Sequence, residues 1–186
     1  MVVANAGVSE NVLGLERELE AATRALFATN VDGVFNTILP LLEAMKERRA
    51  GRIVIMSSLA SIMPLAGSVA YCGSKAAVRA YGEALRGAVY RDGVRVNVIC
   101  PAYIESAMTK ANSFKMPGIL TMDSAIRTMT RAIAADKPVT FLPATHALPA
   151  WALARVLPSD LSHALARRRW AAVLSYLRPS RRVKGK

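Results

Sequence analysis

The sequence predicts an α/β fold in which helices cross over between the strands of a parallel sheet. Short apolar runs rich in β-branched residues are bounded by turn residues, and longer segments with helical spacing separate them. Strands that alternate with helices pair in parallel, because each helix carries the chain back to the same end of the sheet. We expect strands at 2–4, 52–56, 94–99 and 138–142.

Four helices are expected in the segments between these strands. The clearest is 31–49, in which Phe35, Ile38 and Leu42 recur at the spacing of one helix face. For the last helix we expect Asp123 to be the N-cap, because a short polar side chain there accepts the unpaired backbone N–H groups of the first turn. The remaining helices are expected at 16–27, about 69–91 and 123–135.

Composition indicates one soluble domain followed by a basic tail. Apolar residues make up 53% of the 186 residues and charged residues 20%, which is usual for a globular protein with a sizeable core. The net charge is +12, and the segment 151–186 carries +8 of it, from nine Lys or Arg residues against one Asp. We therefore expect a domain at 1–145 and a helical basic tail at 146–186.

Membrane spans, disulfide frameworks and metal sites are not expected. The uncharged segment 53–74 is long enough to cross a bilayer, but its five serines, one proline and two glycines favour a strand, a loop and a helix start. Two cysteines fit a reducing, cytoplasmic location. His146 and His163 lie too far apart in the sequence to indicate a metal site, and no motif for specific nucleic-acid binding is present.

Tyr71 and Lys75 place a phenol and an ammonium group on one face of a helix. A free tyrosine has a pKa of about 10. A neighbouring cation stabilises the phenolate, so we expect the pKa of Tyr71 to be lowered and its phenol to exchange protons near neutral pH. Such pairs also occur on ordinary surface helices, so the pair does not define a site by itself.

Further polar residues lie where strands end. Ser58 follows one expected strand, the segment 101–106 follows the next, and Asn30 lies at the start of a helix one crossover earlier. Parallel strands end at one edge of the sheet, and ligands of open α/β sheets bind at that edge. We therefore expect these residues to lie close to Tyr71.

Taken together, these motifs resemble those of the short-chain dehydrogenase/reductase family. The similarity runs from Val2 to about Leu142, in the family's order and at its usual spacings, and consists of Asn5-Ala6-Gly7, Asn30, Ser58, Tyr71-x-x-x-Lys75 and the segment from Pro101. It implies a partial Rossmann-like, doubly wound parallel sheet that contains the family's strands 4–7. It also implies the interconversion of an alcohol and a carbonyl in a small molecule, with NAD or NADP as cofactor.

The resemblance implies four catalytic residues. Tyr71 would be the general acid/base, and Ser58 would orient the carbonyl or alcohol. Lys75 would lower the pKa of Tyr71 and hold the nicotinamide ribose, and Asn30 would complete a proton relay through water. The cofactor-binding residues would be Asn5, Ala6, Gly7, Tyr71, Lys75, Pro101, Ala102, Ile104 and Ser106.

The chain departs from the family in two respects. The family begins with a strand, a glycine-rich turn and a helix whose N-terminus receives the cofactor pyrophosphate, and none of these precedes Asn5 here. We therefore expect the strand at 2–4 to form a sheet edge, and the 186-residue chain alone to be inactive, to bind no nicotinamide cofactor measurably and to self-associate. In addition, Ala102 replaces the family's glycine and Ser106 its threonine.

Two alternatives to an enzyme remain. The helices at 31–49 and 69–91 resemble the family's subunit-packing helices, which predicts a homo-oligomer and also fits a non-catalytic partner that docks on a full-length relative. The tail interleaves tryptophans and leucines with arginines, as in a helix that lies on an anionic membrane surface. The presence of Ser58, Tyr71 and Lys75 favours the enzyme.

Overall fold

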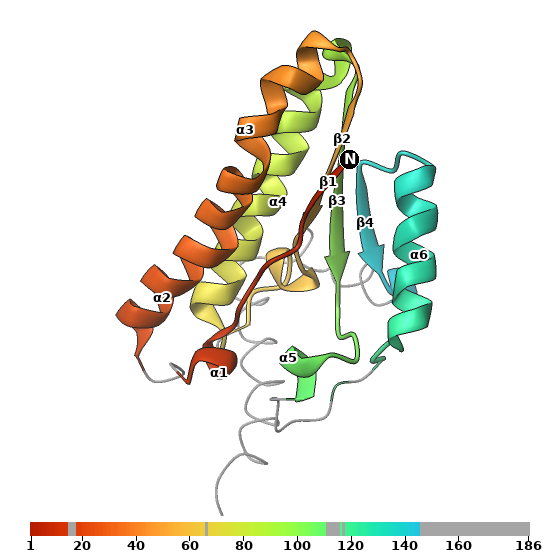
Figure 1. The fold of residues 1–186 in the computed structure, drawn as a ribbon. Coiled ribbons are helices and arrows are strands. Elements are labelled where there is room, and N and C mark those ends of the chain that lie inside the picture. Colours follow the sequence, from red (N-terminus) through yellow and green to blue (C-terminus); the bar gives the residue numbers. More distant parts are fainter. Residues whose placement is uncertain (15–17, 66, 111–115, 117, 146–186) are drawn as a thin grey trace, which may run out of the picture.

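In the computed structural model, which describes residues 1–14, 18–65, 67–110, 116 and 118–145, four parallel strands form one sheet (Figure 1). The order β1-β2-β3-β4 follows the sequence, so β1 is an edge among the described strands and its Val3 is 45% exposed. The expected parallel α/β fold is confirmed. The tail expected at 146–186 lies outside the described residues. The strands are β1 (Val2–Ala4), β2 (Gly51–Met56), β3 (Val94–Pro101) and β4 (Val139–Leu142).

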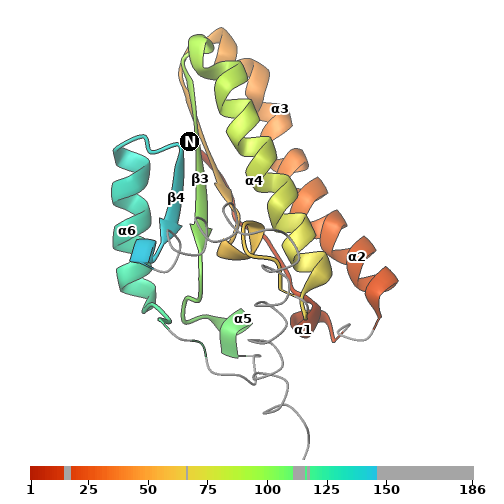
Figure 2. The same ribbon diagram turned by 180° about the vertical axis from the view of Figure 1, so that it is seen from behind.

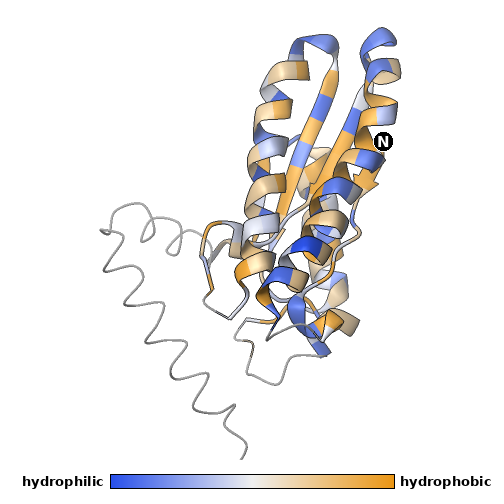
Figure 3. Ribbon diagram, turned by 90° about the vertical axis from the view of Figure 1, so that its left-hand side faces the viewer, coloured by the Kyte–Doolittle hydropathy of each residue, from blue (hydrophilic) through white to orange (hydrophobic). Residues whose placement is uncertain are grey.

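Helices cover both faces of the sheet. The helices α2 (Leu19–Phe27), α3 (Gly33–Glu47) and α4 (Val69–Val89) lie on one side, and α6 (Met122–Ala134) lies on the other (Figures 1 and 2). Alternate residues of β2 therefore enter different cores: Ile53 and Ile55 pack with α3 and α4, and Val54 packs with the α6 side. Figure 3 shows the strands largely in the apolar colour, as expected for a parallel sheet buried on two faces.

The helices α2 and α3 form one continuous helix rather than two. A π-helical segment, Ala28–Asp32, joins them, so the expected break before residue 31 is wrong. No residue in this segment stops a helix, and the wider π turn directs Asn30 and Val31 into the protein, where both are buried. The combined helix is long and apolar enough to cross a membrane by length and composition alone. Its Val34, Ile38 and Met45 nevertheless pack in the core beneath the sheet.

Three local features differ from the sequence-based expectation. Thr121, not Asp123, is the N-cap of α6, because Thr121 is extended and its side chain accepts the N–H of Ser124; Asp123 lies in the first helical turn. Pro101 is the last residue of β3 rather than a residue that ends it at Ile99. A short helix, α1 (Glu10–Leu13), was not expected.

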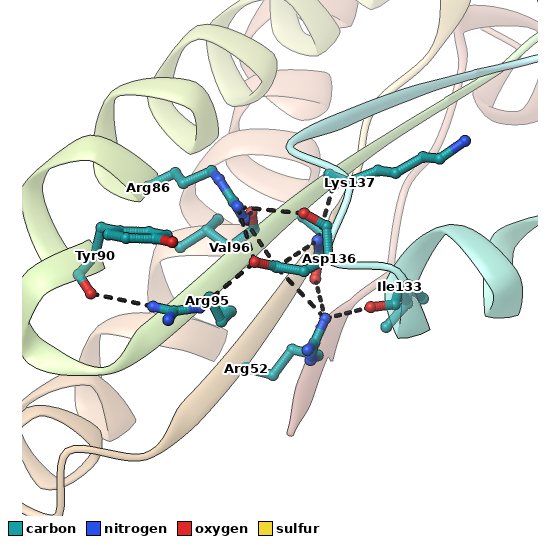
Figure 4. A network of polar contacts seen from close by, with 9 residues as sticks. Arg52, Arg86, Tyr90, Arg95, Val96, Ile133, Asp136 and Lys137 are labelled. Carbon is teal, nitrogen blue, oxygen red and sulfur yellow. Dashed lines mark hydrogen bonds and ion pairs between the residues drawn. The ribbon is translucent and has the colours of Figure 1, made fainter.

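An ionic cluster stabilises the amino ends of the strands (Figure 4). Asp136, in the turn between α6 and β4, lies 2.9 Å from Arg86 of α4, 3.4 Å from Arg95 of β3 and 3.6 Å from Arg52 of β2. Asn97 donates a further hydrogen bond to the same carboxylate. The hydrogen bond from Arg86 is the largest of the effects that lower the pKa of Asp136. One carboxylate in the α6–β4 turn therefore links α4, β2 and β3.

Replacing Asp136 with Asn should lower the free energy of unfolding at pH 7 by about 1–2 kcal/mol, the scale of a charged hydrogen bond after solvent screening. The pKa of Asp136 is lowered in the folded state, so its contribution exists above pH ~4 and disappears as the pH falls through the folded-state pKa. Urea unfolding at pH 7 and pH 3 measures both effects. The control is Glu20→Gln, which breaks an exposed pair with Arg24 and should change stability by less than ~0.5 kcal/mol. Equal stability of the two variants would contradict the role of the cluster.

Candidate functional site

The predicted site residues lie at the carboxyl edge of the sheet. Asn5-Ala6-Gly7 follows β1, Ser58 follows β2, and Ala102 to Ser106 follow β3. Tyr71 and Lys75 lie in the first two turns of α4. These segments reach one edge because all four strands are parallel.

Asn30 connects the segment after β1 to α4. Its side chain is completely buried; Oδ1 accepts the N–H of Val8 at 2.8 Å, and Nδ2 donates to the carbonyl of Val8 and to Ser74 Oγ, both at 3.0 Å. Both amide hydrogens are therefore used within the protein. The Asn30 side chain therefore joins the segment after β1 to α4, and the proton relay through Asn30 stays a prediction.

Lys75 is buried beside this connection. It is 4% exposed, and its ammonium donates to the carbonyl of Met56, the last residue of β2, at 2.9 Å. A Cβ atom at Gly7 would lie 3.1 Å from Lys75 Nζ and 3.3 Å from Asn30 Oδ1, so Gly7, Asn30 and Lys75 meet closely. An ammonium group has three N–H donors, and within the described residues one of them has an acceptor.

Ser58 connects the ends of two strands with Tyr71. Its hydroxyl accepts the N–H of Ala60 at 3.2 Å and lies 3.4 Å from the carbonyl of Pro101. Ser58 is also near enough to the Tyr71 phenol to lower its pKa, and Lys75 Nζ lies 5.8 Å from the centroid of the Tyr71 ring. The phenol, the hydroxyl and the ammonium therefore form one local group.

Burial controls the electrostatics of this group. Desolvation raises the pKa of Tyr71; the neighbouring Ser58 side chain works against the rise, and nearby Cys72, Glu10 and Tyr103 add to it. This direction is opposite to the one expected from the Tyr–Lys spacing, because the phenol is surrounded by protein although Tyr71 as a whole is only half-buried. Desolvation also lowers the pKa of Lys75 to about 8.

The predicted cofactor-binding residues differ in their exposure. Asn5 and Ala6 are exposed, and Gly7 is half-buried. Pro101, Ala102, Ile104 and Ser106 are also half-buried.

The segment that contains Ser106 is stabilised by Thr109 of α5 (Ala107–Lys110), a residue that sequence reasoning missed. Thr109 Oγ1 accepts the Ser106 N–H at 2.8 Å and donates to the carbonyl of Ile104 at 2.7 Å. A lone threonine three residues after Ser106 carries no signal in the sequence that would have pointed to this role.

Sequence reasoning also missed Ser57 and Glu10. Ser57 Oγ donates to the carbonyl of Lys75 at 2.8 Å and joins α4 to the end of β2. Glu10 is 5% exposed, and its carboxylate accepts the backbone N–H of Tyr71 at 2.9 Å. The Ser57-Ser58 pair at a strand end was a usable signal for Ser57, whereas nothing in the sequence near Glu10 marks it as buried. In the part of the chain that the structure describes, no group of His, Cys, Asp and Glu is arranged to hold a metal ion.

Residues 1–116 match the sequence profile of the family described as short chain dehydrogenase. The chain belongs to this family. This short-chain dehydrogenase is 37% identical to an uncharacterized oxidoreductase of Myxococcus xanthus (strain DK1622). The alignment spans 168 residues, which are 90% of this chain and 66% of that relative. The chain is 33% identical to the 3-oxoacyl-[acyl-carrier-protein] reductase FabG of Salmonella typhimurium, over 61% of this chain and 46% of the relative. The chain thus spans about half to two thirds of the length of these relatives.

Solved structures show the same fold for this short-chain dehydrogenase. A gluconate 5-dehydrogenase from Burkholderia cenocepacia J2315, in complex with NADP and tartrate, aligns with a TM-score of 0.64 at 23% identity and covers 75% of this chain and 61% of its own. ElxO with NADP bound aligns with a TM-score of 0.62 at 19% identity, over 75% of this chain and 64% of its own. The expected membership of the family and its Rossmann-like fold are confirmed.

Replacing Lys75 with Met should change how stability depends on pH. A lysine whose folded-state pKa is about 8 binds fewer protons in the folded than in the unfolded state between pH 8 and about 10.5. The stability of the wild type therefore rises with pH in this window relative to the variant. The difference in unfolding free energy between variant and wild type should shift in favour of the wild type by about 1–2 kcal/mol between pH 7 and pH 9.5. A constant difference in urea titrations at these two pH values would show that burial does not lower the pKa of Lys75.

Proposed function

We propose that the chain carries the catalytic groups of an NAD(P)-dependent oxidoreductase that interconverts an alcohol and a carbonyl in a small molecule. The observation that carries the proposal is the group formed by Tyr71, Ser58 and Lys75 at the carboxyl edge of the sheet. A proton donor, a second hydroxyl and a buried cation meet there, as acid/base chemistry on a carbonyl oxygen requires. Membership of the short-chain dehydrogenase family supports the assignment.

The residues present fit the nicotinamide end of NAD or NADP. Lys75 has N–H donors without an acceptor among the described residues, and Gly7 leaves space beside its ammonium that a Cβ atom would fill. The two solved relatives described above hold NADP. We assign the ribose and nicotinamide contacts to Asn5, Ala6, Gly7, Tyr71, Lys75, Pro101, Ala102, Ile104 and Ser106. When bound, the cofactor supplies or accepts the hydride.

Tyr71 transfers the proton. Its raised pKa keeps the phenol protonated at neutral pH, so in the reducing direction the hydroxyl can donate a proton to the carbonyl oxygen as that oxygen gains negative charge. Ser58 donates a hydrogen bond to the same oxygen and orients it. Lys75, with a pKa of about 8, is largely protonated at pH 7, and its charge stabilises the phenolate that remains. Asn30 and Ser57 support these groups through the backbone contacts of Val8 and Lys75.

The reaction is tested on two proteins: the 186-residue chain, and the same chain preceded by the N-terminal segment of the Myxococcus relative. The extended protein should oxidise NADPH or NADH with members of a ketone panel, and Tyr71→Phe should reduce its turnover about 100-fold or more. The control is Tyr90→Phe, which removes a hydroxyl from a half-exposed tyrosine at the far end of α4 and should leave turnover unchanged. Equal turnover of Tyr71→Phe and the wild type would remove Tyr71 from the mechanism.

The 186-residue chain alone should show neither turnover nor calorimetric binding of NADPH. The pyrophosphate and adenosine contacts of the family lie in the segment that precedes the part matched here. A loss of even ~4 kcal/mol of binding free energy weakens affinity roughly a thousandfold. Micromolar binding by a monodisperse sample of the chain would contradict this part of the proposal.

A further inference from the structure

Glu10 is a buried acid that the proposed chemistry does not use. It lies in α1, just beyond the segment that follows β1, and is 5% exposed. Carboxylates are rarely buried to this extent unless they are paired. Its Oε1 accepts the Tyr71 N–H at 2.9 Å, whereas Oε2 is buried without a hydrogen-bond partner in the described part of the chain.

The contact lies in the first turn of α4. Tyr71 is the third residue of this helix, where backbone N–H groups have no acceptor within the helix. Ser68, at the N-cap position, makes no capping hydrogen bond with its side chain. Glu10 therefore supplies the acceptor from 61 positions earlier in the sequence, and its negative charge lies at the helix end that favours an anion.

Two opposite charges thus flank Tyr71 from different elements. Glu10 approaches from α1, and Lys75 lies one helical turn further along α4. The ammonium of Lys75 donates to Met56, and no ion pair joins it to Glu10 among the described residues.

We propose that Glu10 is a positioning residue for Tyr71: its carboxylate anchors the tyrosine backbone and adds a negative charge next to this residue, opposite in sign to that of Lys75. This inference rests on the proposed role of Tyr71 as the proton-transfer group. The other groups that face Tyr71 are Cys72 of α4, Ser58 at the end of β2 and Tyr103 after β3. Desolvation is the largest cause of the raised pKa of Tyr71, and Glu10 adds to it.

Two variants distinguish the anchoring role of Glu10 from its electrostatic role. Glu10→Gln keeps an oxygen that can accept the Tyr71 N–H but removes the charge, whereas Glu10→Ala removes both. Both are made in the 186-residue chain labelled with ¹³Cζ-tyrosine, in which Tyr71→Phe identifies the Tyr71 signal. The control is Glu18→Gln, which removes an exposed acid just before α2.

An NMR titration above pH 7 measures the pKa of Tyr71, and hydrogen exchange measures protection of its amide. Glu10→Gln should shift the pKa of Tyr71 downward, because a negative charge that disfavours the phenolate is lost, while Glu18→Gln leaves it unchanged. Glu10→Ala should shift this pKa in the same direction and also increase exchange of the Tyr71 amide roughly tenfold, the effect of losing about 1.4 kcal/mol of capping.

An unchanged pKa of Tyr71 in Glu10→Gln would overturn the electrostatic role. Unchanged amide exchange in Glu10→Ala would overturn the anchoring role, and if that variant does not fold, Glu10→Met takes its place, because methionine fills similar space without an acceptor oxygen. Neither measurement needs cofactor or substrate. A shifted pKa together with full turnover by Tyr71→Phe would contradict the proposed function and leave the placement of the phenol by Glu10 intact.

Discussion

The arrangement of the site depends on the burial of one ammonium group. Removing the charge of Lys75 from water is costly, and the hydrogen bond to Met56 at the end of β2 compensates only part of that cost. A Cβ atom at Gly7 would lie 3.1 Å from this group, so the missing side chain of Gly7 leaves room for it, and Ser57 holds the backbone of Lys75 against β2. The segment after β1, the end of β2 and α4 must therefore meet in one way for this cation to be accommodated.

The ionic cluster around Asp136 and the proposed catalytic residues lie at opposite ends of the sheet. At the amino ends of the strands, the carboxylate of Asp136 forms ion pairs with Arg52, Arg86 and Arg95. At the carboxyl ends, some buried polar groups lack hydrogen-bond partners among the described residues. These are N–H donors of the Lys75 ammonium and one carboxylate oxygen of Glu10. Such unsatisfied groups are costly in a frame that serves only stability, and they are typical of a site prepared for a ligand.

Much of the fold and of the site could be predicted from the sequence. Apolar runs and helical spacing located all four strands, and the rule that parallel strands end at one edge placed Ser58 and the segment 101–106 near Tyr71. The continuous α2–α3 helix could not be predicted, because no residue between 28 and 32 marks a π turn in the sequence and the burial of Asn30 is a tertiary feature. The direction of the shift in the pKa of Tyr71 could not be predicted for a related reason. Sequence spacing reveals the neighbouring charge of Lys75, but the desolvation of the phenol is visible only in the structure.

The most direct test of this account is the pKa of Lys75 itself, measured by ¹³Cε NMR titration of the chain with Lys75→Met as the assignment control. A buried ammonium held for a ligand should titrate near pH 8, far below the value of about 10.4 for an exposed lysine. In the extended protein, added NADP should raise this pKa, because a polar ligand that accepts from the ammonium stabilises its charged form. A value near 10.4 in the chain, or no response to NADP in the extended protein, would contradict the claim that Lys75 is a desolvated cation held for the cofactor.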